Sequence, residues 1–88
     1  MEKMGGNIKA IKIQILFFGH LSESIGQKSI EVVLKEGTNI GQLLERFQLS
    51  GFLETGSKIS INDEFCEDLS VILTDSSEVA LLPPFSGG

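Results

Sequence analysis

Residues 11–18 read IKIQILFF. Every second side chain is an isoleucine or a phenylalanine, and the side chains between them begin with lysine and glutamine. A period of two in β-branched residues is typical of a half-buried β-strand. The predicted core face consists of Ile11, Ile13, Ile15 and Phe17. The other face becomes apolar at Leu16 and Phe18, so the strand has a second apolar patch opposite the core.

Two more elements follow this strand. Residues 30–35 alternate in the same way, and the short connection predicts an antiparallel pair with the first strand, with residues 22–27 as a polar loop. In residues 38–47, the apolar side chains recur at the i, i+3, i+4, i+7 spacing of one helical face. Thr38 or Asn39 is the expected N-cap, and Gly41 weakens the helix by up to about 1 kcal/mol relative to alanine.

The second half of the chain predicts short strands. Residues 59–61 alternate before a turn at 62–63, residues 49–57 read as irregular, and the last strand covers residues 78–82. Strands with a single crossing helix predict an α+β fold, in which one main helix packs on a mixed sheet. We expect a domain at residues 11–82, a flexible N-terminal extension at 1–10 and an extended C-terminal tail at 83–88.

The composition excludes several classes of function. A chain of 88 residues with a net charge of −5 lacks the clustered cations that nucleic acids and anionic membranes require. No apolar run approaches the roughly 18 residues of a membrane span. The N-terminus lacks the apolar region of a signal peptide, so we expect a cytoplasmic protein.

The chain has one cysteine, Cys66, and one histidine, His20. A single cysteine excludes an internal disulfide and a multi-cysteine metal cluster. We expect Cys66 to be structural and His20 to lie at a strand end rather than to bind a metal.

Residues 81–88 read LLPPFSGG. Pro83 and Pro84 lack amide hydrogens, so they end the strand and extend the tail. Gly87 and Gly88 give the thinnest backbone that can lead a carboxylate into a narrow channel. If ATP converts that carboxylate to an acyl-adenylate, a sulfur nucleophile can displace AMP and leave a thiocarboxylate on Gly88. The alternative is an inert, disordered tail.

From about Ile11 to Gly88, the chain resembles the small subunits of molybdopterin synthase, which are ubiquitin-like β-grasp sulfur carriers. The resemblance lies in ILFFG at 15–19, INDE at 61–64 and the run from 73 to 88. The matching positions of that run are Leu73, Asp75, Glu78, Val79, Pro83, Pro84, Gly87 and Gly88. Ser76 and Ser77 replace the family's Gly and Asp, which leaves the type of that turn open.

This resemblance implies a function. Gly88 would be adenylated with ATP and thiocarboxylated by an enzyme related to ubiquitin-activating enzymes, with sulfur from a donor. The tail, made of Pro83, Pro84, Phe85, Ser86, Gly87 and Gly88, would enter the large subunit and pass sulfur to a pterin precursor. The catalytic pocket would belong to the large subunit, in a heterotetramer of two small and two large subunits. The chain alone would be no enzyme and would bind no cofactor and no metal.

The partner-binding face follows from alternation and from the resemblance. Alternation places Phe18 and Leu82 on the outer side of the sheet, and the resemblance implies partner contacts at Phe18, Phe65 and Leu82. Exposed apolar patches of this kind mark interfaces. The alternative is a second small core beneath residues 51–57.

Other functions remain open at this stage. The chain could carry sulfur for thiamin synthesis or tRNA thiolation, although the thiamin carrier resembles the pattern only in its Gly-Gly end. It could also be a protein modifier joined to lysines through Gly88, or an interaction module with an inert tail.

Overall fold

The computed structural model describes residues 9–54 and 56–84. The tail positions Phe85, Ser86, Gly87 and Gly88 and most of the predicted N-terminal extension lie outside the described residues. The elements are β1 (Ala10–Phe17), α1 (His20–Ile25), β2 (Ser29–Lys35), α2 (Ile40–Arg46), α3 (Gly51–Glu54), β3 (Lys58–Ile61), β4 (Glu64–Cys66) and β5 (Glu78–Leu82).

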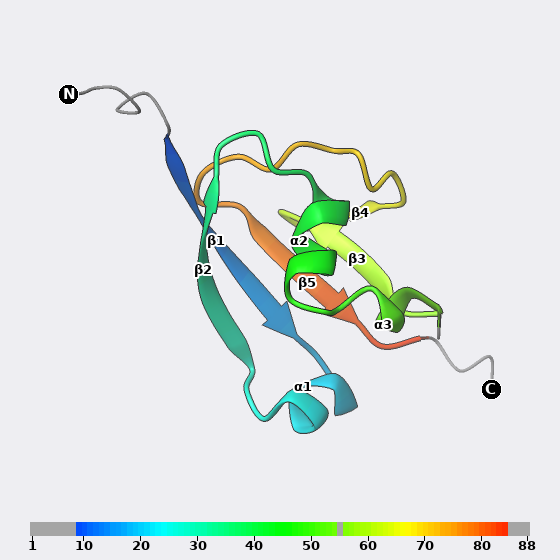
Figure 1. The fold of residues 1–88 in the computed structure, drawn as a ribbon. Helices are drawn as coiled ribbons and strands as arrows, with labels where there is room; N and C mark the ends of the chain where they lie inside the picture. The colour runs from blue at the N-terminus through cyan, green and yellow to red at the C-terminus, as the bar shows by residue number, and fades with distance from the viewer. Residues whose placement is uncertain (1–8, 55, 85–88) are drawn as a thin grey trace.

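The five strands form one mixed sheet in the order β2-β1-β5-β3-β4 (Figure 1). β1 is antiparallel to β2, as the sequence predicts, and parallel to β5. β3 is antiparallel to both β5 and β4. The first and last strands of the chain therefore lie side by side within the sheet, and the predicted α+β class is confirmed.

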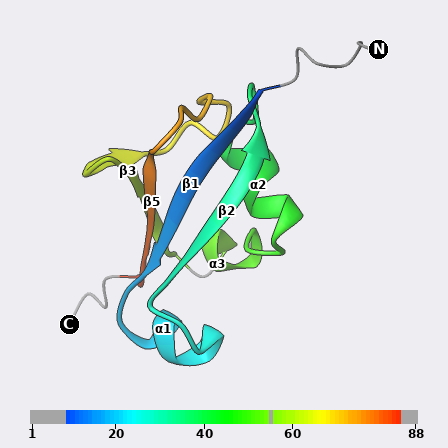
Figure 2. The same cartoon turned by 90° about the vertical axis from the view of Figure 1, so that its left-hand side faces the viewer.

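The core lies between the sheet and α2. Figure 2 shows α2 and α3 on the same side of the sheet. The predicted core face of β1 is confirmed, because Ile11, Ile13, Ile15 and Phe17 are all buried. They are joined by Val32, Leu34, Ile40, Leu43, Leu44, Ile59, Val79 and Leu81.

Helix α2 begins after Asn39, one of the two predicted caps. The Asn39 side chain accepts a hydrogen bond from the Gln42 backbone N–H, and the Gln42 side chain accepts one from the Asn39 N–H, which is a capping box. The N–H of Gly41 donates to the carbonyl oxygen of Leu69 at 2.9 Å. A Cβ at Gly41 would lie 3.4 Å from that oxygen, so the glycine that weakens the helix also lets the loop approach it.

Two short helices were not predicted, since residues 22–27 and 49–57 read as loops. α1 buries only Leu21, with Ile25 partly buried four residues later, and α3 has no buried residue. Helices this short have no periodic face to detect. Each helix has one local signal, because Gly26 after α1 and Gly56 after α3 both have the positive φ that favours glycine.

The two predicted turns are present. Asn62 and Asp63 both have positive φ, 51° and 73°, in the two-residue connection between β3 and β4, as in a type I′ turn. At the second turn, Ser76 has φ 69° and donates its N–H to the carbonyl oxygen of Lys12 at 2.8 Å. A positive φ is the conformation that glycine adopts most easily, which explains the glycine that the family has where this chain has Ser76.

Candidate functional site

The outer face of the sheet, opposite α2, carries a row of small and apolar side chains. Register places Leu16 beside Ala80, Ala80 beside Ser60, and Ser60 beside Phe65. These residues alternate with the core residues of their strands, so they face away from α2. In the part of the chain that the structure describes, no helix covers this face (Figure 2).

Phe18 and Leu82 extend the apolar surface toward the end of β5. Phe18 lies just beyond β1 rather than within it, but its N–H still donates to the Leu81 carbonyl oxygen at 3.3 Å. Phe18 is 44% exposed and Phe65 is 66% exposed, whereas Leu82 is half-buried. The alternative of a second small core is therefore wrong for the two phenylalanines. We call Phe18, Phe65 and Leu82, with Leu16, the outer patch.

The root of the tail follows this patch directly. Pro83 and Pro84 are half-buried and come straight after β5. Pro83 lies against Gly19 and Pro84 against Gly56. Sequence reasoning missed these contacts, because the two glycines are remote from the prolines along the chain.

Cys66 lies at the end of β4 and packs partly against the core. Its Sγ donates to the carbonyl oxygen of Asp68 at 3.2 Å. The hydroxyl and the backbone N–H of Ser70 both donate to the Asp68 carboxylate, and these bonds hold the pKa of that carboxyl below its usual value. An open groove of about 460 Å³ beside Cys66 is also lined by Leu53, Phe65 and Ser57. His20, expected at a strand end, instead begins α1 and does not line this groove.

Residues 9–54 and 56–84 contain no group of three or more histidine, cysteine or acidic side chains placed to hold a metal ion. Nor does any helix in these ranges have the length and apolar character to span a membrane.

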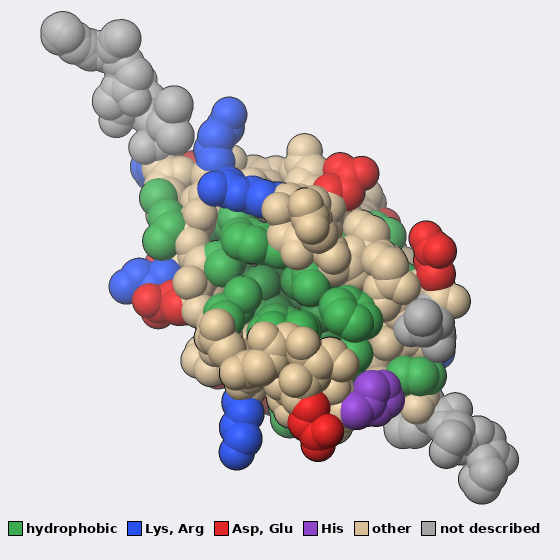
Figure 3. All heavy atoms as spheres, turned by 60° about the horizontal axis from the view of Figure 1, so that its bottom comes forward, with side chains coloured by type: hydrophobic (Ala, Val, Ile, Leu, Met, Phe, Trp, Pro, Cys, Tyr) green, Lys and Arg blue, Asp and Glu red, His purple; other side chains and the backbone are tan. Residues whose placement is uncertain are grey.

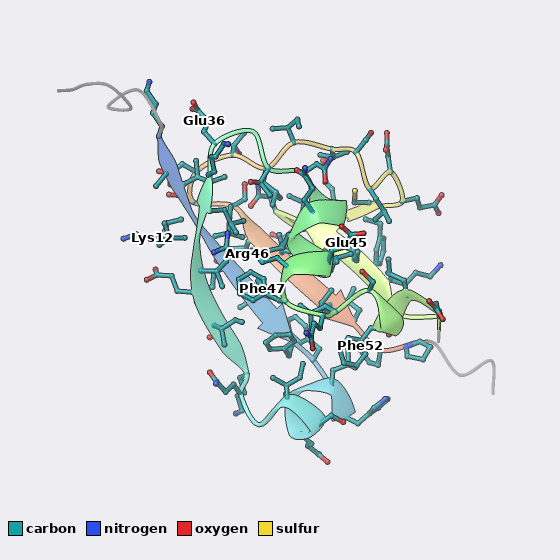
Figure 4. All side chains as sticks on the ribbon, viewed as in Figure 1. Lys12, Glu36, Glu45, Arg46, Phe47 and Phe52 are labelled. Atoms are coloured by element: carbon teal, nitrogen blue, oxygen red, sulfur yellow. The ribbon has the colours of Figure 1, made fainter. Side chains whose placement is uncertain are left out.

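A second apolar region lies on the helix side. Hydrophobic side chains gather in the centre of the face in Figure 3, with charged side chains toward its edge. Phe47 follows α2 and Phe52 lies on α3, and both pack partly buried against the core (Figure 4). The Arg46 guanidinium lies over the Phe47 ring, 5.7 Å from its centre. These contacts make the region an extension of the core.

A mixed five-stranded sheet with a helix across one face, and with its first and last strands parallel and adjacent, defines a ubiquitin-like β-grasp domain. The outer patch lies beside the tail root, on the open face of this domain. The chain belongs to the ThiS family, whose family model matches residues 15–88. The resemblance drawn from the sequence is thus confirmed at the level of the family.

Three relatives are named molybdopterin synthase sulfur carrier subunit. The one from Aedes aegypti is 28% identical over 90 residues, covering 91% of this chain and 92% of the relative. The one from Mycobacterium tuberculosis is 31% identical, covering 89% and 99%. The one from Dictyostelium discoideum is 33% identical, covering 88% and 96%.

Solved structures agree on the fold. The HVO 2177 protein of Haloferax volcanii matches with a TM-score of 0.76 and 22% identity, over 90% of this chain and 88% of that one. Small archaeal modifier protein 1 of the same organism matches with 0.72 and 22%, over 88% and 99%. A chain of the complex of subunits 1 and 2 of the molybdopterin-converting factor from Helicobacter pylori matches with 0.65 and 24%, over 89% and 100%.

Proposed function

We propose that this chain is the sulfur carrier subunit of a molybdopterin synthase. The observation that carries the proposal is the similarity, over nearly the full length of both chains, to proteins of that name. The Pro-Pro and Gly-Gly pattern of the tail supports it, because a thin, extended arm suits delivery of a terminal atom into a partner.

The proposed chemistry takes place on Gly88. On an activating enzyme, its carboxylate attacks the α-phosphorus of ATP, which forms an acyl-adenylate and releases pyrophosphate. Sulfide from a sulfur donor then attacks the carbonyl carbon. A C–S bond forms, the C–O bond to AMP breaks, and a thiocarboxylate remains. The activating enzyme binds the ATP in this scheme, and the carrier contributes the carbon that is activated.

The proposed partner is the large synthase subunit, in a heterotetramer of two carriers and two large subunits. It would dock on the outer patch and receive the tail, composed of Pro83, Pro84, Phe85, Ser86, Gly87 and Gly88. The exposure of Phe18 and Phe65 on this face supports the surface, because large exposed apolar side chains gathered on one face mark interaction sites. The pocket that binds the pterin precursor would lie in the large subunit, and transfer would take place in the cytosol.

The intact mass of the protein tests the proposal. We expect protein purified from cells that make the molybdenum cofactor to contain a species heavier by one oxygen-to-sulfur exchange, located at Gly88 by peptide mapping. Loss of the species when the activating enzyme is absent is the control. Unchanged mass together with heavier conjugates on a denaturing gel would instead favour a protein modifier joined through Gly88.

Replacing Cys66 with serine should leave sulfur transfer within about twofold of wild type. The transferred sulfur is on the main-chain carbonyl of Gly88 in this mechanism, and the hydroxyl of serine can still donate to the Asp68 carbonyl oxygen that Sγ now binds. Transfer rates in a reconstituted assay and the thermal midpoint should be measured together. A Cys66→Ser protein that folds normally but no longer transfers sulfur would place the thiol in the relay.

A further inference from the structure

The two prolines at the tail root each lie against a glycine. A Cβ added at Gly19 would lie 3.0 Å from the Cγ of Pro83. A Cβ added at Gly56 would lie 3.2 Å from the Cβ of Pro84. Both distances are shorter than ordinary van der Waals contact between carbon atoms, so a larger residue at either position would require its proline to move by a few tenths of an ångström.

Strand pairing explains how such distant residues meet. β1 runs parallel to β5, with Phe17 beside Leu81, so Gly19 is carried to the level of Pro83. β3 runs antiparallel to β5, with Lys58 beside Leu82, so Gly56 is carried to the level of Pro84. The glycines thus approach the tail root from the strands on the two sides of β5.

Each glycine also has a local role. Gly56 has φ +93° after α3, where its N–H donates to the Leu53 carbonyl oxygen and the Ser57 N–H donates to that of Phe52. These two bonds form a Schellman motif. Gly19 precedes α1 with φ 60° and ψ −142°, a region open almost only to glycine. Gly19 and Gly56 therefore have two roles: each lies at one end of a short helix, and each leaves the space that a proline occupies.

We propose that Gly19 and Gly56 form a proline cradle that sets the direction in which the tail leaves the domain. This inference rests on the proposed function and deepens it. The outer patch docks on the partner while the tail delivers the reacting atom, and a small misplacement of a reacting atom lowers the rate even where docking is intact. Gly56 is then a positioning residue for sulfur transfer, acting through Pro84.

The chain offers a matched control for Gly56. Gly26 also follows a short helix and has φ +85°, but a Cβ there would meet nothing within 4 Å. Gly26→Ala and Gly56→Ala therefore impose the same kind of backbone strain, and only Gly56→Ala pushes on a proline.

The experiment compares the two variants with wild type in a reconstituted transfer assay with activating enzyme, ATP, sulfide donor and large subunit. An error of about 1 Å costs on the order of 100-fold in rate, so a shift of a few tenths of an ångström in Pro84 should lower kcat roughly 4- to 10-fold. Gly26→Ala should leave kcat unchanged. KM for the large subunit should stay near wild type in both, because the outer patch is intact.

Nuclear Overhauser contacts test the cradle independently of the transfer assay. In unmodified protein, the Gly56 α-protons should show contacts to the Pro84 β-protons, and Gly56→Ala should shift the Pro84 resonances while Gly26→Ala should not. If Gly56→Ala does not fold, Pro84→Gly removes the same contact from the tail side and should lower kcat by a similar factor.

The outcomes separate the cradle from the function. Absence of the Gly56–Pro84 contacts overturns the cradle, whether or not the chain transfers sulfur. Active wild type with equal kcat in Gly56→Ala and Gly26→Ala also overturns it. Wild type that carries no sulfur in the complete reconstituted assay overturns the proposed function instead. The nuclear Overhauser contacts and the Pro84 resonance shifts then decide whether the cradle exists.

Discussion

Gly88→Leu is expected to abolish sulfur transfer while the fold and docking through the outer patch persist. In the proposed mechanism, the reacting atom is the carbonyl carbon of Gly88, and a leucine side chain there would clash in a channel shaped for glycine. Folding should be unaffected, because the core residues lie between Ile11 and Leu81. The measurements are product formation in the reconstituted assay, the thermal midpoint, and binding to the large subunit.

One glycine added after Gly88 is the companion variant, because it changes length without adding bulk. It moves the terminal carbon by about 3.3–3.6 Å along an extended chain. Since about 1 Å of misplacement can cost on the order of 100-fold, this variant should also be inactive. Near-normal product from either variant would remove the terminal carboxylate from the mechanism and favour the inert-tail alternative.

Phe18→Ala should weaken binding of the large subunit at least about tenfold, since apolar residues at the centre of an interface can cost more than about 1.4 kcal/mol on truncation. Its effect on folding should be smaller, because the side chain is 44% exposed and is not part of the buried core cluster. The dissociation constant and the free energy of unfolding should be measured on the same preparation.

Two neighbouring variants make this result interpretable. Val33→Ala removes a side chain that is 58% exposed on the same face but on β2, away from the tail, so it should change affinity little. Ile15→Ala opens a cavity in the core and should cost about 2–5 kcal/mol of stability, a large part of a total of about 5–15 kcal/mol. Collapse of Phe18→Ala, with normal binding by its folded fraction, would assign Phe18 to the core.

The strongly patterned elements were predictable, because burial on one face leaves a periodic trace. β1, β2, α2 and β5 lie within two residues of their expected bounds. The alternation in β1 also predicted which of its residues are buried. α1 and α3 escaped prediction because they bury too few residues to create a period.

The proline cradle was beyond sequence reasoning for a different reason. Gly19 and Gly56 are visible in the sequence, but their partners follow from the parallel pairing of β1 with β5 and the antiparallel pairing of β3 with β5. Short-range patterns carry no information about which strands become neighbours. Only the assembled sheet brings each glycine to its proline.

The position of β5 has a consequence for how the molecule assembles. Ile15 and Val79 pair across nearly the whole described chain, so that contact requires closing a very long loop, and such contacts form slowly. β5 separates β1 from β3, so the sheet is continuous only once this last strand has been inserted. The segment that leads to the tail is thus the one that completes the sheet. In the proposed mechanism, a nascent or damaged chain without β5 would present neither a complete outer patch nor an arm, so the activating enzyme would have no terminal carboxylate to adenylate.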